Sequence, residues 1–347
     1  MTDAYAIAGV DTGAADRAIG ALVGVLRTID PGRASRAVAL PGHYAAVLEV
    51  APNLGIAIGT DGVGSKLIVA ELTGRYDTVG IDCVAMNVND VICVGAEPIA
   101  VVDYLAVEQT DPEVFEAIAR GLKAGAEQAG VEIPGGEVAV LPELIRGHPS
   151  PGGFDLTAAC FGTVALDRIL SGRDCAPGDA LIGLPSSGLH SNGYTLARRA
   201  LEPLGLDHRP SALGGATVAD ALLEPTVIYV RAVLELLRSG VPVHGLAHIT
   251  GGGISNLLRL SDRVGFVIEQ PLPVPPVFDL VRAHGTVPEA EMWSVFNMGC
   301  GFVAVVPEAA ADEAVALLAA HHPGAARIGS VTARAGSVGV LPLGVAL

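Results

Sequence analysis

Short hydrophobic runs alternate with longer amphipathic stretches along the first half of the chain. The runs predict buried strands at 54–60, 99–107 and 156–164, and apolar residues at helical spacing predict helices at 78–95 and 111–130. The second helix opens with Asp-Pro-Glu, a favourable cap and first turn, and ends at a glycine. This alternation predicts a mixed sheet covered by helices.

A polar stretch rich in Gly and Pro, residues 167–179, interrupts the pattern and marks the expected boundary between domains at 1–168 and 169–347. Beyond it we expect strands at 180–184, 264–269 and 301–306, helices at 192–205, 219–239 and 308–321, and a glycine-rich turn at 250–253. Pro225 should kink or start the second of these helices. The predicted fold is therefore α+β, with two α/β domains whose sheets are each covered by helices on one side.

Composition limits the classes of function. Half of the 347 residues are hydrophobic and 17% are charged, which predicts a large core. The chain has 37 acidic and 21 basic residues, a net charge of −16 and no run of Lys or Arg, so binding to nucleic acid is disfavoured. A polyanion can bind such a protein locally, through glycine-rich backbone, helix N-termini or a bridging Mg²⁺.

Cysteine usage and the N-terminus favour a cytoplasmic protein. The five cysteines are scattered without a CxxC pair, which indicates neither a disulfide framework nor a zinc site. The first residues lack a basic region followed by an apolar segment, and no apolar stretch approaches the roughly 20 residues of a membrane span. We therefore expect no membrane association.

Five segments are dense in glycine: 59–66, 134–137, 186–194, 250–255 and 297–302. Glycine lets backbone N–H groups converge on a ligand oxygen without a Cβ clash. Asp61 lies where a predicted strand meets the first of these segments, and a carboxylate there can bind Mg²⁺. The alternative is an aspartate that stabilises its own turn.

Acidic and amide side chains also share one face of the helix at 78–95. Asp82, Asn89 and Asp90 fall within about 100° of arc, among apolar neighbours. No Lys or Arg lies on this helix, so a cation is a natural partner for the carboxylates. Capping and backbone hydrogen bonding within the fold is the alternative.

Basic and polar residues beside the glycine segments are candidates for phosphate binding and proton transfer. The segment at Lys66 lacks Walker A spacing, yet Lys66 can reach a phosphate as a point charge, or lie solvated. Ser191 or Asn192 should cap a helix at an anion site. His190 and His248 are acid/base candidates. The other histidines are predicted to be structural: His43, His148, His208, His244, His284, His321 and His322.

At these motifs the chain resembles the phosphoribosylformylglycinamidine cyclo-ligases, also called aminoimidazole ribonucleotide synthetases. The matching segments keep their order along nearly the whole chain: 5–11, 60–67, 80–98, 103–104, 134–137, 186–194, 224–230, 247–253 and 296–301. Two segments depart from the family. Residues 35–47 hold only Gly42 where members often carry a glycine-rich nucleotide lid, and in GGEVAVLPE Val138 and Val140 replace a hydroxyl and a carboxylate.

The resemblance implies a homodimer in which N-terminal sheets pair into a barrel, with Mg-ATP near the interface and formylglycinamidine ribonucleotide as substrate. It places ATP and dimerisation in the N-terminal domain and substrate phosphate in the C-terminal domain. The implied catalytic residues are Asp61, Asp90, His190 and His248, and the implied metal ligands are Asp61, Asp90 and Glu137. The implied nucleotide contacts are Gly59, Thr60, Gly62, Gly64, Lys66, Asp82, Asn89, Gly135, Gly136 and Glu137, and the implied substrate contacts are Ser187, Ser191, Asn192, Gly251, Gly252 and Gly253.

Other readings remain open at this point. Another ATP-using member of the superfamily is one, although a selenophosphate synthetase would need a reactive N-terminal cysteine and the first here is Cys83. A non-catalytic nucleotide-binding paralogue is the other, favoured by the altered GGEVAVLPE segment. The Asp61, Asp90 and His190 motifs favour the enzyme.

Overall fold

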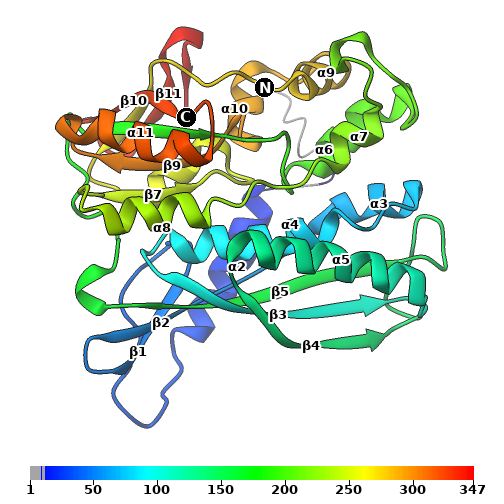
Figure 1. The fold of residues 1–347 in the computed structure, drawn as a ribbon, viewed down its shortest axis with the longest axis horizontal. Helices are drawn as coiled ribbons and strands as arrows, with labels where there is room; N and C mark the ends of the chain where they lie inside the picture. Colours follow the sequence, from blue (N-terminus) through cyan, green and yellow to red (C-terminus); the bar gives the residue numbers. More distant parts are fainter. Residues whose placement is uncertain (1–8, 10–11) are drawn as a thin grey trace.

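The computed structural model describes residue 9 and residues 12–347, and it contains two sheets, each in its own domain. The motif at 5–11 lies outside the described residues, apart from Gly9. Figure 1 shows the N-terminal domain, blue to green, below the C-terminal domain, green to red. The predicted α+β fold of two α/β domains is confirmed, and the expected boundary after residue 168 lies between the two sheets.

The N-terminal sheet has five strands in the order β1-β2-β5-β3-β4. Its strands are β1 (Ala46–Ala51), β2 (Leu54–Gly62), β3 (Glu97–Val107), β4 (Glu132–Val140) and β5 (Phe154–Val164), and only β3 and β4 pair in parallel. Helix α4 (Val79–Ile92) packs on one face, with α5 (Pro112–Ala129) against it. The two helices approach closely because Gly80 has no side chain: a Cβ there would lie 2.2 Å from the Leu122 nitrogen.

The ends of α5 follow the sequence signals. The Asp111 carboxylate accepts hydrogen bonds from the backbone N–H groups of Glu113 and Val114, which caps the helix, and Gly130 ends it with a left-handed φ of 74°. The described part of this domain also contains α2 (Thr12–Leu26), the short helix η1 (Gly64–Lys66) and α3 (Leu67–Thr73).

The C-terminal sheet has seven strands in the order β12-β11-β8-β10-β6-β9-β7. They are β6 (Ala180–Pro185), β7 (Gly245–His248), β8 (Gly265–Ile268), β9 (Cys300–Val306), β10 (Ala326–Thr332), β11 (Val338–Val340) and β12 (Val345–Ala346). The α-helices around it are α6 (Tyr194–Leu201), α7 (Val218–Leu223), α8 (Val230–Ser239), α9 (Pro276–Gly285), α10 (Glu289–Val295) and α11 (Ala311–His321). Every residue of β9 is buried, which explains its continuous apolar run.

Two sequence predictions need correction. The helix expected at 219–239 is two helices, α7 and α8, because residues 224–229, around Pro225, form an irregular segment that bonds to α4. The helix expected to begin near residue 192 begins at Tyr194 with Gly193 as its cap residue, so neither Ser191 nor Asn192 caps it. The glycine-rich segment 134–137, for which no element was predicted, lies inside β4.

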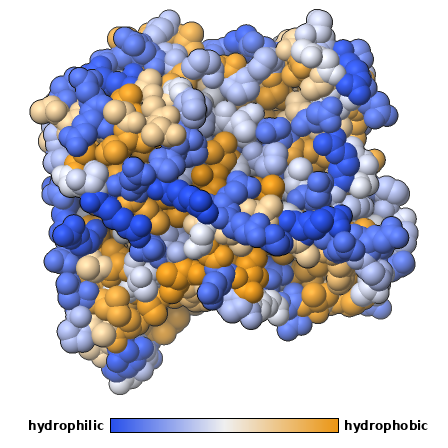
Figure 2. Space-filling view, viewed as in Figure 1, coloured by the Kyte–Doolittle hydropathy of each residue, from blue (hydrophilic) through white to orange (hydrophobic). Residues whose placement is uncertain are grey.

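The face of the N-terminal sheet opposite α4 exposes apolar side chains. Leu48, Leu54 and Tyr104 are each more than a third exposed, and strand register puts them on this face. Figure 2 shows hydrophobic residues gathered across the lower half of the view, where this domain lies. The sheet is open in this single chain, with β1 and β4 at its edges, so the implied dimeric barrel stays a prediction. Among the described residues, no helix is long and apolar enough to cross a membrane.

Candidate functional site

A buried lysine joins the two domains. The Lys66 Nζ lies 2.7 Å from Asp82 Oδ2 and donates to the backbone carbonyls of Glu224, at 2.7 Å, and His190, at 3.2 Å. Both charged side chains are fully buried. Burial lowers the pKa of Lys66, and the neighbouring Asp82 opposes this shift. Its three donors are thus occupied, and the expectation that Lys66 reaches a phosphate is not supported by this geometry.

Asp82 and Asn89 have similar structural partners. Asp82 Oδ1 accepts hydrogen bonds from the backbone N–H of Thr226, at 2.8 Å, and from its hydroxyl, at 2.6 Å. Asn89 donates to the Val227 carbonyl at 2.8 Å and accepts from the Tyr229 N–H at 3.0 Å. For Asp82 and Asn89 the hydrogen-bonding alternative is therefore the right one: both side chains hold the irregular segment 224–229 against α4.

Asp90 lies on the same helix but meets a histidine of the other domain. His248 ends β7, is fully buried, and places its Nδ1 2.8 Å from Asp90 Oδ1. This contact puts the imidazole proton on Nδ1, so Nε2 carries a lone pair. That Nε2 is buried and has no hydrogen-bond partner among the described residues. A ligand with a donor group can satisfy it.

Asp61 lies in the same region as Asp90. It occupies the end of β2, which runs through Gly62 and so extends further than predicted, and its Oδ1 accepts the Gly62 N–H at 2.7 Å. Burial raises the pKa of Asp61, the Gly62 hydrogen bond lowers it, and the nearby Asp90 raises it further. The two carboxylates are therefore close enough for their charges to interact.

Strand register separates Glu137 from these carboxylates. Asp61 pairs with Ala158, Ala158 with Asp103, and Asp103 with Gly136, so these four share the face that α4 covers. Glu137 follows Gly136 and is exposed on the opposite face. Within one chain it cannot join Asp61 and Asp90 at a metal ion, which corrects the implied ligand set.

Asp103 is a residue to which sequence reasoning gave no role. Its side chain lies over Gly136, where a Cβ would be 2.3 Å from Asp103 Oδ1, and this explains the glycine inside β4. Burial raises the pKa of Asp103. Asp103 lies on the same face of the sheet as Asp61 because of the register of β2, β5 and β3. The hydrophobic periodicity of a single segment could not indicate this.

Two carboxylates remain as candidate ligands for Mg²⁺. No group of three or more His, Cys, Asp or Glu side chains able to hold a metal occurs in the described part of the chain. Asp61 and Asp90 each use one oxygen within the protein and have a second oxygen left for a ligand. Mg²⁺ on a nucleotide keeps waters and phosphate oxygens and needs only one or two carboxylates, so this pair fits it.

His190 lies beside the interdomain lysine with a strained backbone, φ 59°. Its Nε2 accepts the Ser187 N–H at 3.4 Å, which puts the proton on Nδ1, and Nδ1 is buried without a partner among the described residues. Burial, then the charges of His248 and Lys66, lower its pKa well below the usual value. The neutral ring therefore presents one unused N–H donor.

The implied substrate-binding residues divide into two groups. The Ser187 hydroxyl donates to the Pro225 carbonyl at 2.6 Å, and the Ser191 hydroxyl lies 3.3 Å from that of Thr226, so both face the 224–229 segment. Asn192 lies against Gly251, where a Cβ would be 3.1 Å from its Oδ1. Both Asn192 and the adjacent Gly251 and Gly252 remain partly or fully accessible, whereas Gly253 is buried.

Of the implied nucleotide contacts on β2, Gly59 and Gly62 continue the strand and the exposed Thr60 donates its hydroxyl to the Ala158 carbonyl. Gly64 has a left-handed φ of 72° where η1 begins. Gly135 and Gly136 lie in exposed β4, three strands from β2. The six-residue span from Gly59 to Gly64 is therefore mostly strand, and only its end forms a turn.

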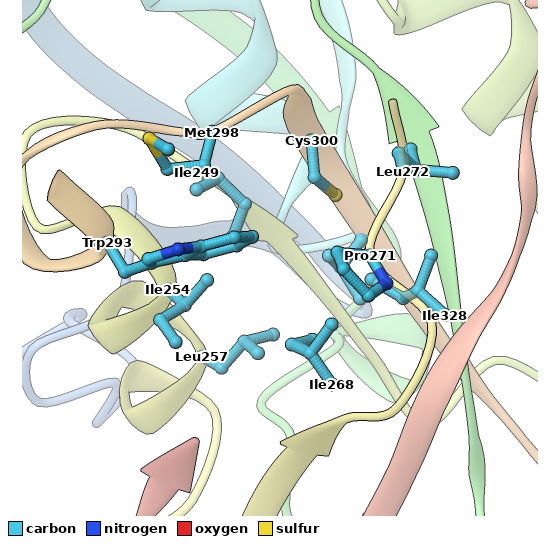
Figure 3. A pocket seen from close by; sticks show the side chains of 11 residues that line it. Ile249, Ile254, Leu257, Ile268, Pro271, Leu272, Trp293, Met298, Cys300 and Ile328 are labelled. Carbon is cyan, nitrogen blue, oxygen red and sulfur yellow. The ribbon is translucent and has the colours of Figure 1, made fainter. Parts of the chain in front are cut away.

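A small apolar cavity behind the glycine-rich loop is not a ligand site. Ile249, Ile254, Trp293 and Met298 line it, as Figure 3 shows, and its volume is about 10 Å³. That is about the room of one water molecule, with apolar walls and no charged lining group. The cavity belongs to the core that supports residues 250–253.

The two domains together form an interdomain site with carboxylates from one domain and histidines from the other. Family models agree with this division: "AIR synthase related protein, N-terminal domain" matches residues 42–164, and "AIR synthase related protein, C-terminal domain" matches residues 176–341. The chain therefore belongs to the AIR synthase-related family, within its phosphoribosylformylglycinamidine cyclo-ligase branch, as the relatives below establish.

Curated relatives carry that enzyme name. A phosphoribosylformylglycinamidine cyclo-ligase of Thermococcus kodakarensis is 50% identical over 321 residues, 91% of this chain and 92% of the relative. One of Methanothermobacter thermautotrophicus is 51% identical over 303 residues, 86% of this chain and 85% of the relative. The predicted family is thus confirmed.

Solved structures at lower identity show the same fold. Hydrogenase maturation protein HypE in complex with ATP has a TM-score of 0.60 at 23% identity, and covers 87% of this chain and 86% of its own. The Thermus thermophilus protein tt0281 has a TM-score of 0.62 at 23% identity, and covers 88% and 91%.

Proposed function

We propose that this protein closes the imidazole ring of 5-aminoimidazole ribonucleotide, using ATP to activate the formamide oxygen of formylglycinamidine ribonucleotide. The observation that carries the proposal is the interdomain cluster of Asp61, Asp90 and His248, in a chain 50% identical to named cyclo-ligases over 91% of its length.

The reaction couples phosphoryl transfer to ring closure. The γ-phosphoryl group of ATP passes to the formamide oxygen, and ADP is released. This transfer activates the formamide carbon, because a phosphate group leaves it far more readily than oxide does. The ribosyl-bearing nitrogen then attacks the same carbon, phosphate departs with the oxygen, and a proton is lost. Mg²⁺ held by Asp61 and Asp90 would neutralise charge on the transferred phosphoryl group.

The histidines supply complementary proton chemistry. His248 can accept a proton at Nε2, and Asp90 at its Nδ1 stabilises the resulting imidazolium. His190 stays neutral and can donate its Nδ1–H to an oxygen that gains negative charge. The buried Lys66, Asp82 and Asn89 contribute indirectly by fixing the domains that carry these groups.

The active species would be a cytoplasmic homodimer. The uncovered apolar face of the N-terminal sheet, with Leu48, Leu54 and Tyr104, supports pairing with a second copy. Val138 and Val140 lie on the other face of the sheet and leave further apolar area exposed at the β4 edge. Sedimentation equilibrium of the purified chain tests this, and a Tyr104→Asp variant should shift the mass toward the monomer.

The activity test uses purified full-length protein with Mg-ATP and formylglycinamidine ribonucleotide, scored for ADP and for a diazotisable aminoimidazole. Both products should form in equal amounts. Asp61→Asn should abolish turnover, and should also remove the increase in melting temperature that Mg-ATP gives the wild type. A well-folded wild type that binds ATP without forming product would instead support the non-catalytic paralogue.

A further inference from the structure

A cavity between the two domains, separate from the apolar cavity of Figure 3, has no role in the proposed reaction. It has a volume of about 620 Å³ and is bounded by residues 39–43 of the N-terminal domain and by residues 255–262 of the C-terminal domain. This volume accommodates a small phosphorylated metabolite. Its lining includes the hydroxyls of Ser171, Ser255 and Ser261, together with His43 and Arg259.

We propose that this cavity binds a phosphate group of a ligand of the proposed reaction, and that Arg259 is its cationic contact. The identity of the ligand rests on the proposed function. The shared chemistry is a phosphate ester or anhydride, which can come from the nucleotide or from the ribose 5-phosphate of the substrate.

The guanidinium of Arg259 is held in place by an aromatic ring. Its Cζ lies 4.9 Å from the centroid of the Tyr44 ring, which is a favourable cation–π distance. Tyr44 is 7% exposed, and its hydroxyl donates to the Asn256 carbonyl at 3.0 Å, so the ring cannot rotate away. Arg259 itself is exposed and forms no ion pair with an acidic side chain in the described part of the chain.

His43 is the second observation that points to a ligand. Both ring nitrogens are buried, and neither has a hydrogen-bond partner among the described residues, although sequence reasoning predicted a satisfied structural histidine. Burial, and then the charge of Arg259, lower the pKa of His43 to about 4. A neutral ring with one unused donor and one unused acceptor lines the cavity beside the arginine. Such buried polar atoms are costly unless a ligand or water satisfies them.

The location suits a phosphate. The charge of Arg259 lowers the pKa of Asp61 as well as that of His43, and the charge of Asp90 raises the pKa of His43, so the cavity lies in the neighbourhood of the proposed metal carboxylates. Lys66 is paired with Asp82 and is not free to contact a phosphate. Arg259 therefore provides the positive charge that a phosphate near Asp61 and Asp90 needs. Asp262 also lines the cavity and opposes an anion, so the guanidinium must face the phosphate more closely than Asp262 does.

The test measures binding of two probes by titration calorimetry, with full-length protein. The probes are the magnesium complex of a non-hydrolysable ATP analogue, and ribose 5-phosphate. Arg259→Gln should weaken one of them at least tenfold, and Arg259→Lys should weaken it less because the charge remains but the planar fork is lost. The matched control, Arg263→Gln, removes the same charge four residues away and should change either affinity less than twofold.

The affected probe identifies the source of the phosphate. Unchanged affinity of a folded Arg259→Gln protein for both probes would overturn the proposal. If that variant does not fold, modification of wild-type Arg259 by phenylglyoxal, followed by mass spectrometry, decides the question. The bound probe should slow modification of Arg259 but not of Arg263, and equal rates with and without both probes would also overturn the proposal. Because both measurements use binding, absence of turnover would refute the proposed reaction without affecting this result.

Discussion

Replacement of Lys66 by Met should destabilise the protein strongly. The substitution keeps an unbranched apolar side chain of similar volume and removes the ammonium group, which contacts Asp82 and the carbonyls of Glu224 and His190 at 2.7 to 3.2 Å. Asp82 then keeps two hydrogen bonds from Thr226 but has lost its counter-charge in a fully buried position. Removal of one partner from a buried ion pair costs about 3–5 kcal/mol, a large fraction of the roughly 5–15 kcal/mol that stabilises a typical protein.

Urea unfolding measures this loss of stability. Far-ultraviolet circular dichroism monitors the whole chain, and the fluorescence of Trp293, the single tryptophan, monitors the C-terminal domain. The control is Lys123→Met, because the Lys123–Glu127 pair is 71% and 64% exposed, and its loss should cost less than about 0.5 kcal/mol. The double variant Lys66→Met/Asp82→Asn should be more stable than Lys66→Met, since it leaves no unpaired charge.

One result would refute this reasoning. If Lys66→Met unfolds at the wild-type urea concentration but loses affinity for Mg-ATP, the lysine serves a phosphate rather than the domain contact. The two explanations therefore predict opposite outcomes in the unfolding and binding measurements on one variant.

Three further changes test other parts of the structure. Gly253→Ala should destabilise the protein by several times the roughly 1 kcal/mol expected for Gly214→Ala. Both glycines have a positive φ, but a Cβ at Gly253 would lie 2.0 Å from the Trp293 carbonyl oxygen, whereas Gly214 faces open space. Equal urea midpoints of the two variants would contradict this. The pKa of Asp61 is raised in the folded state, so ionisation of this carboxyl group destabilises the folded protein as the pH rises above its pKa in the unfolded state. In EDTA at pH 7, the free energy of unfolding of Asp61→Asn should therefore equal or exceed that of the wild type. This difference should vanish at low pH, where both side chains are neutral. A variant less stable than the wild type at pH 7 would show that the carboxylate has a structural role. His248→Gln should lower kcat by about 10²–10⁴-fold with little change in KM, since it cannot accept the proton; an unchanged kcat in the steady-state assay would remove His248 from the mechanism.

Much of the fold could be predicted from the sequence because its signals are local. The strands at 99–107 and 156–164 were located from their apolar runs, and α5 from its Asp111 cap and Gly130 stop. The helix expected at 219–239 failed because Pro225 does more than kink it. Tertiary hydrogen bonds to α4 make an irregular segment more stable there than a continuous helix.

The candidate site shows a similar limit. Helical periodicity correctly put Asp82, Asn89 and Asp90 on one arc, yet it could not separate their partners. Asp82 and Asn89 bond to the 224–229 segment, and Asp90 meets His248, which is 158 residues away. Their different environments come from the way the second domain docks.

The sequence by itself determined the family, the order of most elements and the chemistry available in an acidic, glycine-rich chain, because motifs, caps and periodicity are properties of neighbouring residues. Only the tertiary structure decided that Lys66 is enclosed, that Glu137 lies on the face opposite Asp61, and that Arg259 is held against Tyr44. Strand register and domain packing join residues that are distant in the chain, and these contacts fix which charged groups are buried, paired or left to meet a ligand.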